Sequence, residues 1–169
     1  ALHEYPEKKL ADIWEHTLND QLNLVRYFDE FQRAIEYQPS EITEGRKSGA
    51  WSVKRQLVAD DVLKRMQLVG SKGEGCEKTV TYELEDSGKS TRLEWLEELS
   101  LVKTLTEQNA GRVIRVQLQK AITDAAAVKS AITKRSDFQS TDYTDIGDNE
   151  SDPFLARMIN QGFSGHRHH

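Results

Sequence analysis

The apolar residues near the start of the chain recur every three or four positions. They are Leu10, Ile13, Trp14, Leu18, Leu22, Val25, Phe28, Phe31 and Ile35. This spacing is typical of one face of an α-helix, and Pro6 is tolerated in a first helical turn. We therefore predict an amphipathic helix over residues 6–37, ended by Pro39. It would be about 48 Å long at 1.5 Å per residue, which favours packing against a second helix or another subunit.

After a polar loop over residues 40–49, apolar and polar residues alternate in short segments, 10 to 15 positions apart. The alternating residues are Trp51, Val53 and Leu57; Val62, Met66 and Leu68; Val80, Tyr82 and Leu84; Leu93 and Trp95; Leu101, Lys103 and Leu105; and Ile114, Val116 and Leu118. Such segments predict an antiparallel meander of about six to seven strands. Asp86-Ser87-Gly88-Lys89 and Asn109-Ala110-Gly111 are its strongest hairpin signals.

Two segments have a second interpretation. Residues 53–68 have a helix-forming composition, but their apolar positions spread around a helical wheel, so we predict two strands. Residues 93–105 place Trp95, Leu99 and Val102 on one helical face, and again we predict strands. Residues 121–135 are predicted to form a helix or a further connecting element.

The predicted fold class is α+β, with a long N-terminal amphipathic helix, a twisted meander and a C-terminal helical segment. We expect a single domain over residues 1–141, because a chain of 169 residues can bury a sizeable core. Residues 142–169 are acidic and irregular, which predicts a flexible tail with a short helix over residues 153–161.

Composition narrows the class of protein. A hydrophobic content of 37% with 30% charged residues is that of a globular chain. No apolar run approaches the roughly 20 residues needed to cross a bilayer, so we predict no membrane span. Cys76 is the single cysteine and cannot form an internal disulfide, which indicates a reducing, intracellular compartment.

The net charge of −5 is arranged in blocks of alternating sign. Residues 1–45, 73–108 and 136–169 are acidic, whereas residues 46–72 and 109–135 are basic. Pairing between blocks within the fold is the favoured interpretation, since surface charges usually do nothing more specific. The alternative is that the basic blocks bind nucleic acid directly, although only Phe138 lies nearby to stack on bases.

The motifs for catalysis are incomplete. Ser87-Gly88-Lys89-Ser90-Thr91 ends like a phosphate-binding loop, but Glu83 stands where that loop requires glycine, so a hairpin turn is favoured. Cys76 has no evident base to activate it. His166, His168 and His169 could chelate a metal, although they stand at the chain end, as a purification remnant would. We predict no enzyme activity, no cofactor and no metal site.

Four segments carry a family resemblance. They are residues 2–18, with Leu10-Ala11-Asp12-Ile13-Trp14; residues 49–65, with Gly49-Ala50-Trp51; residues 78–84; and residues 132–141. In their order and spacing the chain resembles the mitochondrial acidic matrix protein family. The resemblance implies an N-terminal helix, a twisted sheet of about seven strands, C-terminal helices and a ring-shaped homotrimer with an acidic face. The chain departs from the family in being only mildly acidic.

The resemblance implies a non-catalytic, homo-oligomeric platform of the mitochondrial matrix that binds basic or RNA-binding proteins and supports mitochondrial RNA processing or gene expression. The expected acidic face for partners comprises Glu83, Glu85, Asp86, Glu94 and Glu97. The expected helix-packing and oligomer contacts are Leu10, Ile13, Trp14, Leu18 and Trp51. Two alternatives remain open, a direct nucleic-acid-binding protein that uses blocks 46–72 and 109–135, and a β-barrel that binds a small ligand.

Overall fold

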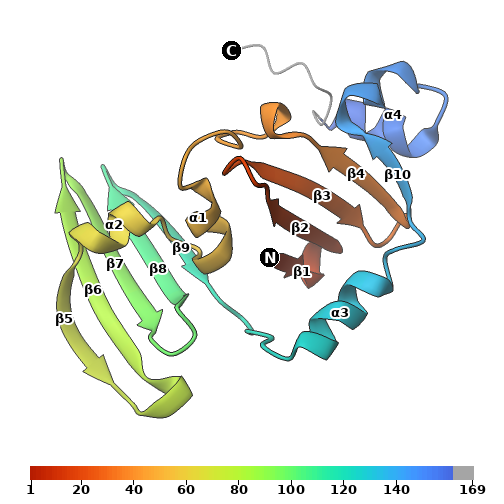
Figure 1. The fold of residues 1–169 in the computed structure, drawn as a ribbon. Helices are drawn as coiled ribbons and strands as arrows, with labels where there is room; N and C mark the ends of the chain where they lie inside the picture. The colour runs from red at the N-terminus through yellow and green to blue at the C-terminus, as the bar shows by residue number, and fades with distance from the viewer. Residues whose placement is uncertain (162–169) are drawn as a thin grey trace. The chain divides into compact units, whose positions relative to one another are not determined.

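The computed structural model describes residues 1–161, and the chain is mostly β-structure (Figure 1). It forms two compact units. Unit 1 comprises Ala1–Trp51 together with the segment that starts at Ile122, and unit 2 comprises Ser52–Ala121. Unit 2 is thus an insertion in the chain of unit 1. The predicted division of the chain at residue 141 does not coincide with this boundary.

Unit 1 is built on a five-stranded sheet in the order β1-β2-β3-β4-β10. Its strands are β1 (Leu2–Tyr5), β2 (Leu10–His16), β3 (Leu22–Phe28), β4 (Arg33–Tyr37) and β10 (Gln139–Asp142). The first four form an antiparallel meander, with a 3₁₀ turn, η1 (Pro6–Lys8), between β1 and β2. Strand β10 enters from the far end of the chain and pairs with β4 in parallel.

The predicted α+β class and its long N-terminal helix are therefore wrong. Residues 6–37 contain three strands, and the first α-helix begins at residue 50. The helix-like spacing of the apolar residues is caused by a part-buried ion pair. Asp12 and Arg26 are opposite one another on β2 and β3, on the same face as Trp14, and the guanidinium donates to both carboxylate oxygens at 2.8 and 2.9 Å.

This pair occupies positions where a half-buried strand normally carries apolar side chains. Leu10 and Trp14 flank Asp12 on β2, whereas Leu24 and Phe28 flank Arg26 on β3. The apolar residues on this face of each strand are therefore four positions apart, which is also the spacing of one face of an α-helix. Side chains do alternate between the two faces of the sheet, but on each strand one position of the core-facing set is charged: Asp12 on β2 and Arg26 on β3.

The rest of unit 1 covers this sheet. It contains η2 (Pro39–Glu41), α3 (Ala125–Thr133), η4 (Tyr143–Asp148) and α4 (Pro153–Asn160). The predicted helix over residues 153–161 is confirmed as α4, and of the two interpretations of residues 121–135 the structure shows the helix, α3. The core joins sheet residues to residues of the C-terminal segment; its buried members are Trp14, Leu22, Leu24, Phe28, Ile35, Tyr37, Ala50, Ile146, Phe154, Leu155 and Met158. The segment predicted to be a tail thus supplies four of the buried core residues.

Unit 2 contains the predicted meander. Strands β5 (Gln67–Lys72), β6 (Thr79–Asp86), β7 (Lys89–Leu96), β8 (Leu101–Asn109) and β9 (Arg112–Gln117) pair antiparallel in sequence order. Both predicted hairpins are confirmed. Their central residues all have positive φ, namely Ser87 (50°) and Gly88 (82°), and Ala110 (47°) and Gly111 (80°). Two successive positive φ angles are the mark of the type I′ turn, whose twist matches that of paired strands.

The prediction of two strands over residues 53–68 is wrong over most of that segment. It forms α1 (Ala50–Gln56) and α2 (Asp60–Arg65), and only its end belongs to β5. Asp60 and Asp61 lie in the first turn of α2, and Lys64 and Arg65 lie in its last turn, so both ends complement the helix dipole. Because neither helix is longer than seven residues, neither is long enough to display a helical period.

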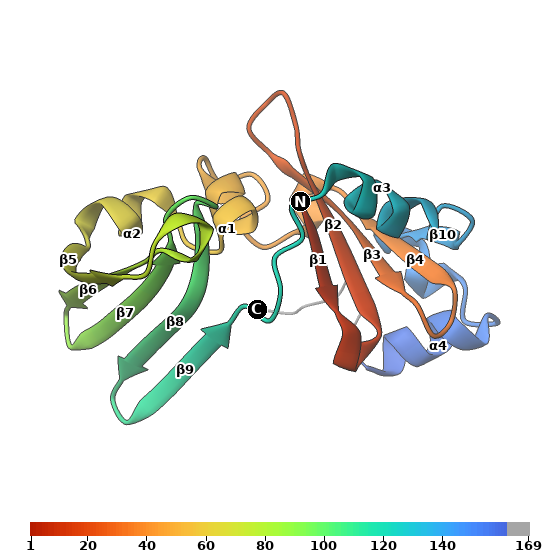
Figure 2. The same ribbon diagram turned by 90° about the horizontal axis from the view of Figure 1, so that it is seen from below.

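The core of unit 2 lies between one face of its sheet and residues 57–66, which include α2 (Figure 2). Its buried residues are Val58, Met66, Leu93, Trp95 and Val102, with Leu57, Val62, Leu63, Tyr82, Leu84 and Leu105 packed around them. A short 3₁₀ turn, η3 (Gly75–Glu77), joins β5 to β6. Both sheets are open, with β1 and β10, and β5 and β9, at their edges. A closed barrel is therefore not formed in the part of the chain that the structure describes.

Arg135 joins the returning chain to the first part of unit 1. Its side chain is only 3% exposed, and its Nε and Nη2 donate to the two carboxylate oxygens of Asp29 at 2.7 and 2.8 Å. Its Nη1 donates to Glu4 at 3.2 Å and to the carbonyl of Ala131 at 2.8 Å. One buried guanidinium therefore links β1, the turn after β3 and the segment that precedes β10.

We expect Arg135→Met to destabilise unit 1 by about 3 kcal/mol, because it leaves Asp29 and Glu4 without their buried cation. Hydrogen exchange of the β2 and β3 amides in increasing urea reports this unit by itself. Arg46→Met is the matched control, since Arg46 is exposed in a loop, and it should change stability by less than about 0.5 kcal/mol. Equal effects of the two substitutions would contradict this role of Arg135.

The hydrogen bonds from Arg135 lower the pKa of Asp29. A carboxyl group whose pKa is lower in the folded state stabilises the fold above its unfolded pKa of about 3.9 and loses that contribution as the pH falls further. Asp29→Asn should therefore destabilise unit 1 at pH 7 and make its stability fall less steeply between about pH 4 and pH 2. Urea midpoints across this range test the prediction, with Asp137→Asn as the exposed control.

Candidate functional site

The predicted acidic face lies on unit 2. Glu83, Glu85 and Asp86 belong to β6, Glu94 belongs to β7, and Glu97 follows β7. Four of the five contact groups of the same unit. Glu83 pairs with Arg92, Asp86 with Arg65 at 3.2 Å, and Glu97 with Lys78 at 2.7 Å, while Glu85 accepts a hydrogen bond from Ser90. Three of the five carboxylates are therefore paired with cations of their own unit.

Some ion pairs join a basic block to an acidic one, as the favoured interpretation predicted: Lys47 with Glu44, Arg65 with Asp86, and Arg135 with Glu4 and Asp29. Others, such as Lys89 with Glu107 at 3.1 Å, form within a single block. The basic blocks 46–72 and 109–135 supply β5 and β9, which are opposite edges of one sheet with the acidic β6 and β7 between them. Within this sheet they form no continuous basic strip.

The predicted helix-packing residues do not share a surface. Leu10 and Trp14 of β2 face the core of unit 1, whereas Ile13 points to the opposite face of the sheet. Leu18 is fully exposed in the turn between β2 and β3. Trp51 packs against the core and stacks on His16, with ring centroids 5.2 Å apart and planes 4° from parallel. These residues cannot pack the predicted first helix, because residues 6–37 form strands.

Cys76 is exposed in η3 and its thiol donates to Glu98 at 3.2 Å. This hydrogen bond and the negative charge of Glu98 raise the pKa of the thiol. A reactive cysteine needs the opposite environment, in which a nearby cation or helix N-terminus favours the thiolate. The geometry therefore gives this thiol little nucleophilic character.

The edge strand β9 is exposed at every one of its six residues. Because a two-residue turn closes the β8–β9 hairpin, Asn109 and Arg112 form a hydrogen-bonded pair and the pattern then alternates. Val113, Arg115 and Gln117 consequently direct their N–H and C=O groups away from β8. Sequence reasoning identified this strand but not its place at an edge, because strand order is a property of the sheet.

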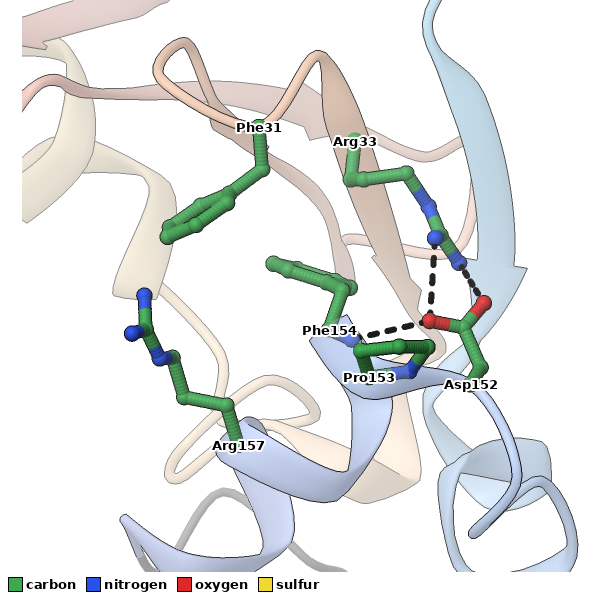
Figure 3. A pocket seen from close by; sticks show the side chains of 6 residues that line it. All are labelled: Phe31, Arg33, Asp152, Pro153, Phe154 and Arg157. Carbon is green, nitrogen blue, oxygen red and sulfur yellow. Dashed lines mark hydrogen bonds and ion pairs between the residues drawn. The ribbon is translucent and has the colours of Figure 1, made fainter.

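An open pocket of about 450 Å³ lies between the turn before β4 and the start of α4 in unit 1 (Figure 3). Its lining residues are Phe31, Arg33, Asp152, Pro153, Phe154 and Arg157. The guanidinium of Arg157 lies over the Phe31 ring at 5.1 Å, and that of Arg33 lies over the Phe154 ring at 4.8 Å. The two rings are 5.4 Å apart. Guanidinium groups and aromatic rings are thus layered along one wall.

The two arginines of this pocket differ in their charge partners. Nη2 of Arg33 lies 2.9 Å from Oδ2 of Asp152, and Oδ1 of Asp152 accepts hydrogen bonds from Nη1 of Arg33 and from the N–H groups of Phe154 and Leu155. These donors lower the pKa of Asp152 and keep it ionised. Arg157 is exposed, and within residues 1–161 no carboxylate lies at ion-pair distance from it. Sequence reasoning missed the pocket, because its two halves are about 120 residues apart.

No group of three or more His, Cys, Asp or Glu side chains in residues 1–161 is arranged to hold a metal ion. His166, His168 and His169 lie outside the described residues. Within the same range, no helix has the length and apolar character needed to cross a membrane.

Comparison of the chain with protein-family models, with curated proteins and with solved structures found no match.

Glu98→Gln should make Cys76 react severalfold faster with iodoacetamide at pH 8, because the loss of the carboxylate lowers the thiol pKa and increases the thiolate fraction. Mass spectrometry of the alkylated protein over time gives the rate. Glu74→Gln is the control, since Glu74 is exposed nearby and does not contact the thiol. Equal rates for the two variants and the parent chain would contradict the assigned effect of Glu98.

Proposed function

We propose that the protein is a non-catalytic binding module that adds an extended, acidic segment of another protein to its sheet at strand β9. The observation that carries this proposal is the continuous exposure of β9, whose outward N–H and C=O groups form a row without a strand beside them in the described structure. An unpaired edge of this kind is a template for one more strand.

The other sheet edges are poorer templates. Strand β5 has a register shift between Leu68 and Gly70, and such a bulge interrupts the hydrogen-bonding row. Strands β1 and β10 of unit 1 contain four residues each. Strand β9 has six residues in continuous register with β8, so it offers the longest regular edge of the four.

The side chains of β9 indicate which segment would fit. Ile114 and Val116 are 43% and 45% exposed, and Val116 continues a row across the sheet through Leu105 and Leu93. An added strand would therefore extend the apolar face with its own apolar residues. On the opposite face, Arg115 lies beside Thr106 of β8. It has no ion-pair partner within residues 1–161.

Charge complementarity then favours a partner strand in which apolar and acidic residues alternate. Apolar side chains would lie beside Ile114 and Val116, while a carboxylate would lie beside Arg115. Exposed charge pairs add little affinity, but they steer association and select against basic partners. The backbone bonds and the apolar row would supply most of the binding free energy.

The protein-binding role implied by the family resemblance is kept, and the contact is proposed at β9, because three of the five residues of the expected acidic face pair with cations of their own unit. Location in the mitochondrial matrix, association with RNA-binding proteins and the homotrimer stay predictions from the family resemblance. Light scattering on a sizing column tests the homotrimer.

Val113→Pro should weaken binding of a fluorescent seven-residue peptide of alternating Glu and Val by at least about tenfold, because it removes an outward N–H from the edge. The fold should persist, since this N–H does not pair with β8. Arg115→Glu should also weaken binding, and most strongly at low salt. Fluorescence anisotropy measures the affinity.

Three controls make the test specific. A peptide of alternating Lys and Val should bind weakly, Arg46→Glu should bind like the parent chain, and Ile114→Pro should destabilise unit 2 because its N–H pairs with β8. Unchanged binding by Val113→Pro would overturn the proposal. So would a dimer of the parent chain that this substitution converts to a monomer, or an RNA oligonucleotide that displaces the peptide.

A further inference from the structure

We propose that the pocket of unit 1 between Phe31 and α4 binds an organic carboxylate that carries an aromatic group. Its residues belong to neither β9 nor any site expected from the sequence. The pocket combines an exposed guanidinium, that of Arg157, with exposed ring surface and with a separate Arg33–Asp152 ion pair (Figure 3).

Arg157 supplies the cation of the pocket. Arg33 and Asp152 neutralise one another, so among the lining residues that the structure describes the unpaired positive charge is that of the exposed Arg157 guanidinium. A guanidinium held against an aromatic face keeps its N–H edge available, and that edge matches the two oxygens of a carboxylate. The ring of Phe31 therefore orients the group that would bind the anion.

The apolar surface of the pocket lies beside this cation. Phe31 is 37% exposed, and Pro153 is exposed across from it, while Phe154 is buried between Phe31 and Arg33. A flat apolar group can contact the free part of Phe31 and the Pro153 ring while its carboxylate reaches Arg157. A simple inorganic anion would use only the guanidinium and leave this apolar surface in water.

Asp152 sets a limit on the ligand. Its carboxylate is committed to Arg33 and to the first N–H groups of α4, so it offers little to a ligand cation. It also places a negative charge at one end of the pocket. We infer that the bound carboxylate lies at the Arg157 end, because Phe31, Phe154 and Arg33 separate that guanidinium from Asp152.

Phenylacetate should bind with a Kd of about 1 mM, as measured by isothermal titration calorimetry with the whole chain. Phenylacetamide lacks the charge and inorganic phosphate lacks the ring, so both should bind at least about tenfold more weakly. The peptide Gly-Gly-Phe carries the same carboxylate and ring at a chain end. Tighter binding than phenylacetate would assign the ligand to a peptide C-terminus, and weaker binding to a small free acid.

Arg157→Gln should weaken phenylacetate binding at least about tenfold, and Phe31→Leu should weaken it severalfold. Both positions are substantially exposed, so thermal unfolding should be nearly unchanged, and Arg46→Gln should bind like the parent chain. Undiminished binding by Arg157→Gln, or phosphate binding as tight as that of phenylacetate, would overturn the proposal. Neither variant should alter peptide binding at β9, which keeps this test separate from that of the proposed function.

Discussion

The buried guanidinium of Arg135 is the contact on which the architecture of unit 1 most depends. The chain leaves this unit after Trp51 and re-enters it at Ile122. On its return, Arg135 binds Asp29 and Glu4, and three residues later Phe138 packs edge-on against Tyr27 at 5.9 Å. Only then does β10 pair with β4, in parallel, which requires a long connection rather than a tight turn.

The C-terminal segment that follows β10 completes the core of unit 1. Ile146, Phe154, Leu155 and Met158 are all buried there. The Arg33–Asp152 pair fixes the start of α4 against β4, since Asp152 binds the arginine and caps the helix at once. The pocket therefore exists because two distant segments dock, and it depends on the same return of the chain that Arg135 holds.

Unit 2 differs from unit 1 in that its sheet contains only strands that follow one another in the sequence and are joined by short connections. The cross-strand ion pairs Glu83–Arg92 and Lys89–Glu107 join neighbouring strands, while its core lies on the face covered by residues 57–66, which include α2. A meander of this kind ends in two edge strands. The bulge in β5 and the regular register of β9 make these edges unequal, and the candidate binding surface follows from that inequality.

The sequence by itself determined the hairpins of unit 2 and the helix α4, because turn residues and helix caps are local features. Tertiary structure alone decided that residues 6–37 form strands, since the buried Asp12–Arg26 pair places charges where alternation needs apolar residues. It also decided the pocket and the β9 edge. The pocket joins Arg33 to Asp152, and the edge depends on strand order, neither of which a local pattern can encode.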